Sequence, residues 1–391
     1  MKCAVVGLGI GLAHVAGYLQ NPRAELVAVA DSWEPRRASV GGTFAQGSMN
    51  VLRPLFEPPH MAAGTADKSW TDLGVRAVDD ARRIAEDQEI ELVSLCTPDD
   101  THEELGTMLL EAGKHLLLEK PLSLTEAGAR RLIKVAAANQ RRVSVGYEFR
   151  VNPAVLRLRE LIETGELGEI RAFSLYHHRT PFRRDKWQNW IQKKERSGGL
   201  LIEETCHWFD LARYLGGATV APAGGPAIQP GRVKECAVRS VHCVGTSEIH
   251  PDFDYEDLAY VQGSYTNGAV FQISHALTGY DFSLVLQLHG TEGTAWCGLK
   301  EERYSSLDGG AGDYLGLVSH GPLNATPRDA EIERYGEGAT EPFNIREYTS
   351  MTVDAMIDGT AFPAGLDDGL QSLRIALAAR RSLETGDVVC L

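Results

Sequence analysis

A chain of 391 residues with 43% hydrophobic and 24% charged residues has the composition of a globular protein with two or three domains. A formal net charge of −14 argues against nucleic acid as a partner. No apolar run approaches the roughly 18 residues of a membrane span, and the seven cysteines lack CxxC spacing, so we expect no membrane segment and free thiols. The short apolar start runs into glycines without a cleavage site, which favours a cytoplasmic protein.

A strand is predicted over residues 2–6, followed by a turn that is typical of dinucleotide binding. The turn residues that we assign to the cofactor are Gly7, Gly9, Ile10 and Gly11. Glycines between a strand and a helix let backbone N–H groups approach a pyrophosphate at the helix N-terminus. The third glycine stands one residue earlier than in the usual Gly-x-Gly-x-x-Gly pattern, and Leu12 takes its place.

A second strand, residues 25–30, ends in Asp31, twenty residues after Gly11. An acidic residue there accepts hydrogen bonds from a ribose 2′-hydroxyl and repels a 2′-phosphate, so we expect NAD, with NADP less favoured. Ser32 and Arg36 are assigned to the same site, although the positive charge of Arg36 weakens the preference. Alternatively, Asp31 caps a helix.

Residues 40–68 are rich in glycine, proline, alanine and methionine and show little periodicity. We expect a long surface insertion that covers the adenosine end of the cofactor or a neighbouring subunit. Regular elements then return, with helices predicted over 78–86, 103–112 and 124–139 and strands over 92–96, 116–120 and 142–146. This alternation predicts an α/β fold in which residues 1–146 form a parallel, doubly wound Rossmann sheet.

The stretch from Lys114 to Leu122 ends an apolar run in Glu119, Lys120 and Pro121. It is typical of a buried strand that reaches the carboxyl edge of a sheet, where open α/β sheets bind their ligands. Pro121 restricts the backbone of Lys120 and holds it in place. Alternatively, Lys120 is only a solvated residue at the end of a strand. Glu119 is either a contact to the cofactor ribose or a solvated charge.

From residue 147 the pattern changes to a helix, 152–164, and then to strands separated by hairpin signals. The strands are predicted over 170–177, 236–244, 259–265, 269–275 and 283–289. Successive hairpins predict a mostly antiparallel sheet in a second domain, residues 147–391. Glycine-rich connections are expected at 218–231 and 309–342. A final helix is predicted over 369–384, and it is a candidate for packing against the Rossmann domain.

Several segments resemble the Gfo/Idh/MocA oxidoreductases, the glucose–fructose oxidoreductase and inositol dehydrogenase group. The matching pieces are VVGLGIG at 5–11, Asp31, SLCTPDDTH at 94–102, LLLEKPL at 116–122, VGYEFRVNPA at 145–154, GELGEI at 165–170, SGGLLIEETCHWFDL at 197–211 and DGLQSLRIALAARRSLETG at 368–386. They follow the family's order over nearly the whole chain. The resemblance implies a Rossmann domain, then an α/β domain with a large open sheet that often serves dimerisation, so we expect a homodimer or homotetramer.

The resemblance also implies roles for individual residues. Lys120 matches the lysine that contacts nicotinamide ribose and substrate, and His207 matches the histidine of the substrate-domain helix. Glu203 stands where the family often has aspartate, and either it or the adjacent Glu204 could orient His207. At i−4, Glu203 would share a helical face with that histidine. In the matching segment 94–102, we also assign Thr97, Pro98 and His102 to the cofactor site.

Oxidation of an alcohol requires loss of a hydride and of the hydroxyl proton, and a base must accept that proton. Histidine titrates near neutral pH, and a lysine beside the nicotinamide cation has its charged form disfavoured. We therefore expect His207 to be the general base and Lys120 to position the hydroxyl and share the proton. Alternatively, His207 is a buried structural histidine. Cys206 is expected to be a small core residue.

Further residues are assigned to the substrate. Tyr147 and Arg150 follow the last Rossmann strand and belong either to the substrate site or to the domain seam. The basic segment 177–190 combines cations with tryptophans, and its assigned members are His178, Arg183 and Trp187. Guanidinium groups suit an anion and a flat ring suits a sugar, so we expect a sugar or cyclitol that in the sharper hypothesis is anionic. The alternative is a basic surface loop.

The leading function is an NAD-dependent dehydrogenase for a sugar or polyol. A second hypothesis is an NAD-dependent glycosidase that oxidises, eliminates, adds water and reduces again, for which Glu204, Tyr147 or His178 could supply a second acid/base group. A third, a non-catalytic dinucleotide sensor, is disfavoured because Lys120 and His207 are both present. No metal site is expected, because the histidines lack ligand-like spacing.

Overall fold

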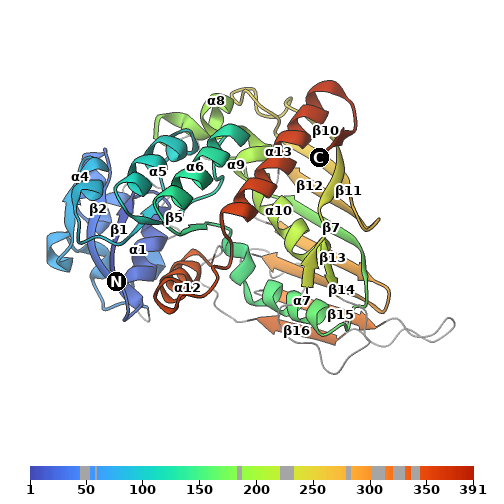
Figure 1. The fold of residues 1–391 in the computed structure, drawn as a ribbon, viewed down its shortest axis with the longest axis horizontal. Helices are drawn as coiled ribbons and strands as arrows, with labels where there is room; N and C mark the ends of the chain where they lie inside the picture. Colours follow the sequence, from blue (N-terminus) through green and yellow to red (C-terminus); the bar gives the residue numbers. More distant parts are fainter. Residues whose placement is uncertain are drawn as a thin grey trace. The chain divides into compact units, whose positions relative to one another are not determined.

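The computed structural model describes residues 1–44, 53–57, 60–182, 187–220, 233–278, 283–300, 313–319, 331–335 and 344–391. Its backbone forms two compact units, each built around a large sheet (Figure 1). Unit 1 comprises Met1–Glu148, Arg183–Gly199 and Phe343–Leu373, and unit 2 comprises Phe149–Phe182, Leu200–Pro342 and Arg374–Leu391. Among the described helices, none combines the length and the apolar character needed to cross a membrane.

The sheet of unit 1 is six-stranded and parallel, with the order β3-β2-β1-β4-β5-β6. Its strands are β1 (Lys2–Val6), β2 (Glu25–Ala30), β3 (Arg76–Val78), β4 (Leu92–Leu95), β5 (His115–Leu118) and β6 (Val143–Val145). The central strands are apolar and buried, as expected when helices cover both faces of a sheet. The strand order reverses between β1 and β4, and the predicted doubly wound Rossmann fold is confirmed.

Unit 1 contains eight described α-helices besides the start of α13, and α5 and α6 begin within two residues of the predicted positions. The eight helices are α1 (Gly11–Gln20), α2 (Glu34–Ala38), α3 (Val40–Phe44), α4 (Arg82–Glu86), α5 (His102–Glu111), α6 (Glu126–Ala138) and, late in the chain, α8 (Lys194–Ser197) and α12 (Ile345–Asp358). The Oγ1 atom of Thr125 accepts a hydrogen bond from the N–H of Gly128 and caps α6. The prediction that a helix begins at Val78 was wrong, because Val78 ends β3 and pairs with Ala30.

Helix α12 packs against α1 and completes the core of unit 1. The Cα of Gly17 approaches Thr349 so closely that a Cβ atom would lie 2.7 Å from the Cβ of Thr349. At the end of α1, the amide nitrogen of Asn21 donates to Ser350. Sequence analysis predicted no helix here. The first residues of α13 (Leu366–Thr385), through Leu373, also belong to unit 1.

The segment 40–68 was expected to be a long surface insertion, but several of its apolar residues are buried. Val40, Leu55, Phe56 and Ala66 are fully buried in the core cluster of unit 1. The scattered apolar residues thus contribute to the core without forming a periodic pattern. Residues 45–52 and 58–59 lie outside the described residues.

The large sheet of unit 2 has nine strands in the order β16-β15-β14-β13-β7-β12-β11-β10-β17. Its strands are β7 (Ile170–His178), β10 (Val238–Thr246), β11 (Leu258–Tyr265), β12 (Val270–Ala276), β13 (Ser283–Gly290), β14 (Gly293–Lys300), β15 (Asp313–Ser319), β16 (Glu331–Tyr335) and β17 (Val389–Cys390). Only the β7–β12 neighbours run parallel within this described sheet, so the mostly antiparallel prediction is confirmed. A glycine-rich connection was predicted over 309–342, and this prediction was wrong for the residues that form β15 and β16.

The helices of unit 2 begin with α7 (Pro153–Glu163), whose N-cap Asn152 accepts from the N–H of Ala154. Two short helices follow β7, namely α9 (Leu200–Glu203) and α10 (Thr205–Leu211), and the chain then makes a π-helical turn over Ala212–Gly216. A two-stranded sheet joins β8 (Ala218–Val220) and β9 (Val233–Glu235). The later part of α13 completes this unit.

Candidate active site

The glycine turn lies between β1 and the N-terminus of α1. Gly7 has φ +92°, and a Cβ atom there would overlap the carbonyl oxygen of Cys96, so only glycine fits. A Cβ atom on Gly11 would lie 2.9 Å from a methyl group of Val5. Leu12, at the place of the usual third glycine, is fully buried in the core. This turn offers the close backbone approach and the helix N-terminus that a pyrophosphate needs.

Asp31 follows β2 and is held by the neighbouring backbone. Its Oδ2 accepts from the N–H of Leu8 at 2.8 Å, and its Oδ1 accepts from the N–H of Trp33 at 2.8 Å. The guanidinium of Arg36 donates to Oδ2 at 3.2 Å. The N-cap of α2 is Trp33, so the alternative that Asp31 caps this helix was wrong.

Arg36 also lies beside the glycine turn, because a Cβ atom on Gly9 would be 3.8 Å from its Nη1. Asp31, Arg36 and Gly9 therefore lie together at this edge of the sheet, as the sequence predicted for the cofactor site. Ser32 contributes a backbone contact, since its carbonyl oxygen accepts from Arg37.

The turn after β4 is fixed by His102. Its Nδ1 lies 2.8 Å from the carbonyl oxygen of Pro121, and its Nε2 lies 3.0 Å from the carbonyl oxygen of Thr97. The side chain is fully buried, and burial lowers its pKa. His102 thus ties Thr97 and Pro98 to the segment after β5, and we infer that it positions the cofactor site through these loops.

Glu119 is neither a solvated charge nor isolated. Its Oε1 lies 2.8 Å from the Nε2 of His14, and both side chains are buried. The Nδ1 of His14 lies 3.0 Å from the Oγ of Ser94, which lies 2.6 Å from the hydroxyl of Tyr18. Burial acts to raise the pKa of Glu119, but the hydrogen bond from His14 and the charges around it outweigh burial and lower the pKa.

Lys120 follows Glu119 directly, at the carboxyl end of β5, where the sequence predicted it. Its side chain is half-buried, its backbone N–H donates to Glu119 at 3.3 Å, and its peptide bond to Pro121 is cis. His14 was missed by sequence analysis. The available signal was its place on the sheet-facing side of α1, where a histidine needs a polar partner.

His207 lies on α10 in unit 2, with its ring edge against Phe149 at a centroid distance of 5.3 Å and beside Trp208 at 5.7 Å. The expectation that Glu203 lies one turn before His207 on a continuous helix was wrong. Glu203 ends α9, and Glu204 separates α9 from α10 with φ −117°. The N–H of His207 donates to the carbonyl oxygen of Glu204 at 3.0 Å.

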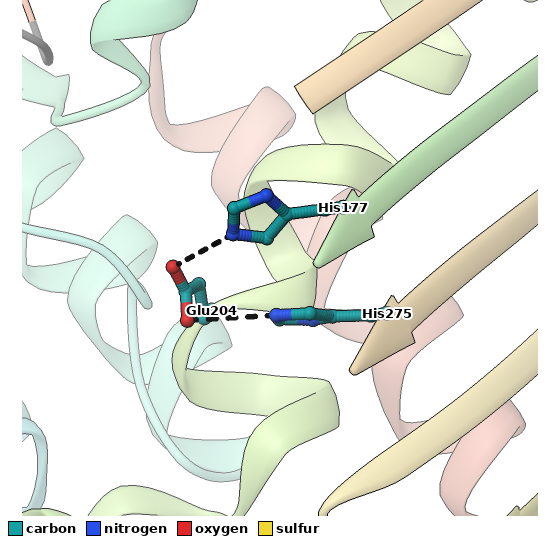
Figure 2. A group of neighbouring side chains, drawn as sticks. All are labelled: His177, Glu204 and His275. Atoms are coloured by element: carbon teal, nitrogen blue, oxygen red, sulfur yellow. Dashed lines mark ion pairs between the residues drawn. The ribbon is translucent and has the colours of Figure 1, made fainter. Parts of the chain in front are cut away.

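Glu204 lies between two buried histidines (Figure 2). Its Oε1 is 3.4 Å from the Nε2 of His177, and its carboxylate also lies 3.6 Å from the Nε2 of His275. Arg179 donates to Oε1 at 2.6 Å. Burial lowers the pKa of His275 to about 4 and lowers that of His177, while Arg179 and the histidines hold the pKa of Glu204 well below its usual range against the opposing effect of burial.

The expectation that the histidines do not cluster was wrong for His177 and His275. These residues are directly opposite each other in the parallel β7–β12 pair. His178, which we had assigned to the substrate, is exposed on the other face of β7, with its Nε2 3.2 Å from the Oγ of Ser274. The alternation of a strand separates His177 from His178, and the pairing of β7 with β12 was not predictable from sequence.

The remaining assigned residues have different surroundings. Arg150 donates to both carboxylate oxygens of Asp210 at 2.7 Å in a buried ion pair, so its guanidinium is engaged within unit 2. Tyr147 is buried in unit 1, and Cys206 is buried in the core of unit 2. Trp187 begins a 3-10 helix, Trp187–Gln192. Arg183 lies outside the described residues.

Comparison with known proteins agrees with this geometry. The family model described as "Oxidoreductase family, NAD-binding Rossmann fold" matches residues 1–147, and the model described as "Oxidoreductase family, C-terminal alpha/beta domain" matches residues 159–391. The chain belongs to the Gfo/Idh/MocA oxidoreductase family. The predicted resemblance and the predicted NAD cofactor are confirmed, and this member of the family is an oxidoreductase.

Individual relatives match almost the whole chain. Inositol 2-dehydrogenase of Rhizobium meliloti (strain 1021) is 25% identical over 98% of this chain and 97% of its own length. The NAD(+)-dependent scyllo-inositol 2-dehydrogenase of Bacillus subtilis (strain 168) is 25% identical over 81% of this chain and 80% of its own length. Levoglucosan dehydrogenase in complex with NADH shares the fold, with a TM-score of 0.75, 20% identity and coverage of 100% of this chain and 98% of that one.

In this family member, the residues that would hold NAD fit the cofactor. The backbone of the glycine turn can approach the pyrophosphate, since a side chain at Gly7 has no room. Asp31 is an anchored carboxylate after β2 that could accept hydrogen bonds from a ribose 2′-hydroxyl. NAD, when bound, would supply the hydride acceptor, and these residues would hold it.

Proposed function

We propose that this oxidoreductase is a dehydrogenase that moves a hydride between nicotinamide and a hydroxyl-bearing carbon of a sugar or cyclitol. The observation that carries the proposal is the similarity to an inositol 2-dehydrogenase over 98% of this chain and 97% of that protein. A similarity of this extent includes both the cofactor unit and the unit that bears His207. The similarity to a second relative, a scyllo-inositol 2-dehydrogenase, supports the same substrate class.

Lys120 and His207 are proposed to act on the substrate hydroxyl. Lys120 positions the hydroxyl and shares its proton, and His207 accepts the proton as general base. Bound NAD would supply the acceptor for the hydride of the substrate carbon. His207 would take the hydroxyl proton onto its imidazole, and Lys120 would hold the hydroxyl oxygen as the carbonyl forms. A base that can take up a proton near neutral pH suits this step, and histidine is the side chain of that kind.

Acidic residues near His207 are proposed to position it. The carbonyl oxygen of Glu204 accepts from the N–H of His207, so the break between α9 and α10 sets the backbone of the proposed base. Glu203 is also buried, within the preceding turn. We keep Glu203 as a candidate for orienting the imidazole; Glu204 acts through the backbone and through its own histidine partners.

The charge of the substrate is a separate question. Arg179, the first cation of the basic segment, is paired with Glu204, which reduces the positive charge available to an anionic ligand. We therefore propose a sugar or cyclitol and treat an anionic group, to be met by Arg183, as the sharper hypothesis. Equal activity on neutral and acidic forms in wild type and in Arg183→Ala would argue against it.

The test is a screen of inositols, hexoses, sugar acids, sugar sulfonates and aryl glycosides with NAD, following NADH and free aglycone together. We expect NADH to accumulate in step with a ketone product for one or more sugars or cyclitols. If none of the panel reduces NAD, the proposal is wrong. Aglycone released without NADH would instead identify a redox-neutral glycosidase.

A further inference from the structure

Three lone-pair donors converge on one buried point of unit 2. We propose that His177, His275 and Glu204 bind a divalent transition metal ion, with Zn²⁺ the best fit. Each residue offers one ligand atom, and the three atoms lie within 4.8 Å of one another (Figure 2). Two imidazoles and one carboxylate form a ligand set that binds zinc and leaves a coordination place for a further ligand.

The hydrogen bonds around His275 direct its lone pair toward the carboxylate. Its Nδ1 lies 2.8 Å from the Oγ1 of Thr205, and that hydroxyl donates its own proton to the carbonyl oxygen of Leu200 at 2.9 Å. The hydroxyl must therefore accept from Nδ1–H, which leaves the Nε2 of neutral His275 with a lone pair. Among the described residues, this Nε2 makes no hydrogen bond, and the side chain is fully buried.

His177 is oriented in the same way. Its Nδ1 lies 3.2 Å from the carbonyl oxygen of Ser283, which can only accept, so Nδ1 carries the proton. Its Nε2 then directs a lone pair toward Glu204. A histidine that donates one ring N–H to a carbonyl or hydroxyl oxygen and directs the other nitrogen inward has the arrangement found at metal ligands.

The separations suit a small metal ion. Tetrahedral zinc with bonds of about 2.0 to 2.1 Å requires ligand atoms roughly 3.3 to 3.4 Å apart. The Nε2 of His275 lies 3.6 Å from the Oε2 of Glu204, and the Nε2 of His177 lies 3.4 Å from Oε1 of the same carboxylate. One ligand atom from each of the three residues lies within 4.8 Å of the other two. The two histidines occupy paired positions on neighbouring strands, so small rotations of their rings are enough to complete the geometry.

Arg179 is a second cation beside this carboxylate, and it does not occupy both oxygens. Arg179 occupies Oε1 from the partly exposed side, and Oε2 makes no hydrogen bond to any described residue. Glu204 can thus bind the metal through Oε2 while Arg179 holds Oε1. Because its charge repels the ion, removal of Arg179 should not weaken binding.

The site is adjacent to the proposed base but distinct from it. Glu204 accepts the backbone N–H of His207, and the ring of Trp208 lies 4.7 Å from that of His177 and 5.7 Å from that of His207. A metal at Glu204 would fix the break between α9 and α10 and hold His207 in place. The metal site depends only on unit 2, so it can be tested without any assumption about the substrate.

The experiment measures metal binding to the full-length protein after removal of metals with a chelator and dialysis. Zn²⁺ titration by calorimetry is expected to show one site per chain, and Co²⁺ is expected to give the visible absorption of a low-symmetry, histidine-bound ion. His275→Ala and Glu204→Gln should each weaken Zn²⁺ binding by more than about 100-fold, because loss of a second-shell partner alone costs about 10- to 100-fold. Arg179→Ala should bind Zn²⁺ at least as tightly as wild type.

The matched control is His242→Ala, which removes a histidine of the same sheet that is not part of the cluster. It should leave the affinity for Zn²⁺ unchanged within about twofold. Absence of saturable Zn²⁺ or Co²⁺ binding in wild type would overturn the proposal, and this needs no variant to fold. Binding that persists unchanged in both His275→Ala and Glu204→Gln would also overturn it.

Discussion

His14 and Glu119 form a buried pair next to Lys120, with the Nε2 of His14 2.8 Å from the Oε1 of Glu119. The other carboxylate oxygen accepts the backbone N–H of Lys120. The pair therefore connects α1 to the segment that carries the proposed catalytic lysine. Its loss should affect both the stability of unit 1 and the position of Lys120.

His14→Ala leaves a buried carboxylate without its histidine partner. We expect the free energy of unfolding, measured with urea, to fall by about 3 kcal/mol, as when one partner of a buried pair is removed, and kcat to fall as well. Tyr18→Phe is the control, because it removes only the hydroxyl at the other end of the same network and should cost about 1 kcal/mol. Equal losses in the two variants would contradict a special role for the pair.

The anchored carboxylate of Asp31 should determine the choice of cofactor. Asp31→Asn keeps the shape but removes the charge that repels a 2′-phosphate and pairs with Arg36. We expect kcat/KM with NAD to fall by about 10- to 100-fold, the equivalent of about 1.5 to 3 kcal/mol for a hydrogen bond to a charged group, and kcat/KM with NADP to rise. Asp72→Asn, at an exposed site of the same unit, should leave the NAD to NADP ratio unchanged. An unchanged ratio in Asp31→Asn would contradict the assignment.

The buried Arg150–Asp210 pair predicts a stability effect. Arg150→Met leaves Asp210 buried without this partner and should lower the free energy of unfolding by about 3 to 5 kcal/mol. The double variant Arg150→Met/Asp210→Leu should recover part of that loss, because no unpaired charge remains. Urea unfolding of the three proteins checks this. If Arg150→Met had normal stability and a raised KM for the substrate, Arg150 would instead be assigned to substrate binding.

Sequence patterns predicted most of the fold. The elements that were missed have weak or interrupted patterns. The parallel strands of unit 1 are continuous apolar runs, and the hairpins of unit 2 carry explicit turn residues, so both were recognisable. Helix α12 follows a glycine-rich segment and packs through Thr349 and Thr352 as well as apolar side chains, which obscures its buried face. Strand β15 alternates Leu315 and Leu317 with glycine, and the glycine suggested a loop.

For the candidate site, residues that follow the ends of strands could be predicted from the sequence. The residues that pair with one another across the fold could not. Asp31 and Lys120 end strands of a doubly wound sheet, and the carboxyl edge of such a sheet is known in advance. The pairing of His177 with His275 depends on β7 lying between β13 and β12, an order that skips far along the chain. The break at Glu204 is likewise invisible in the spacing of Glu203 and His207.

Acid should destabilise unit 2 through His275. Burial lowers its folded-state pKa to about 4, whereas the unfolded chain binds this proton near pH 6.5. The unfolded state therefore gains the proton first, and stability that is fully present above about pH 6.5 is lost as the pH falls toward about 4. With a chelator present, His275→Asn should lose less unfolding free energy between pH 7 and pH 5 than wild type, while His242→Asn should lose as much. An equal loss in wild type and His275→Asn would contradict this.

Single-turnover hydride transfer to NAD tests most directly whether Lys120 and His207 together remove the proton of the substrate hydroxyl. With the best substrate of the screen, Lys120→Ala and His207→Ala should each slow NADH formation by about 10²- to 10⁴-fold, the usual contribution of general acid–base catalysis. NAD binding should stay within a few-fold of wild type in His207→Ala, and Lys134→Ala, at an exposed position of α6, should transfer hydride at the wild-type rate. Near-normal hydride transfer in either catalytic variant, with folding and NAD binding intact, would contradict the account.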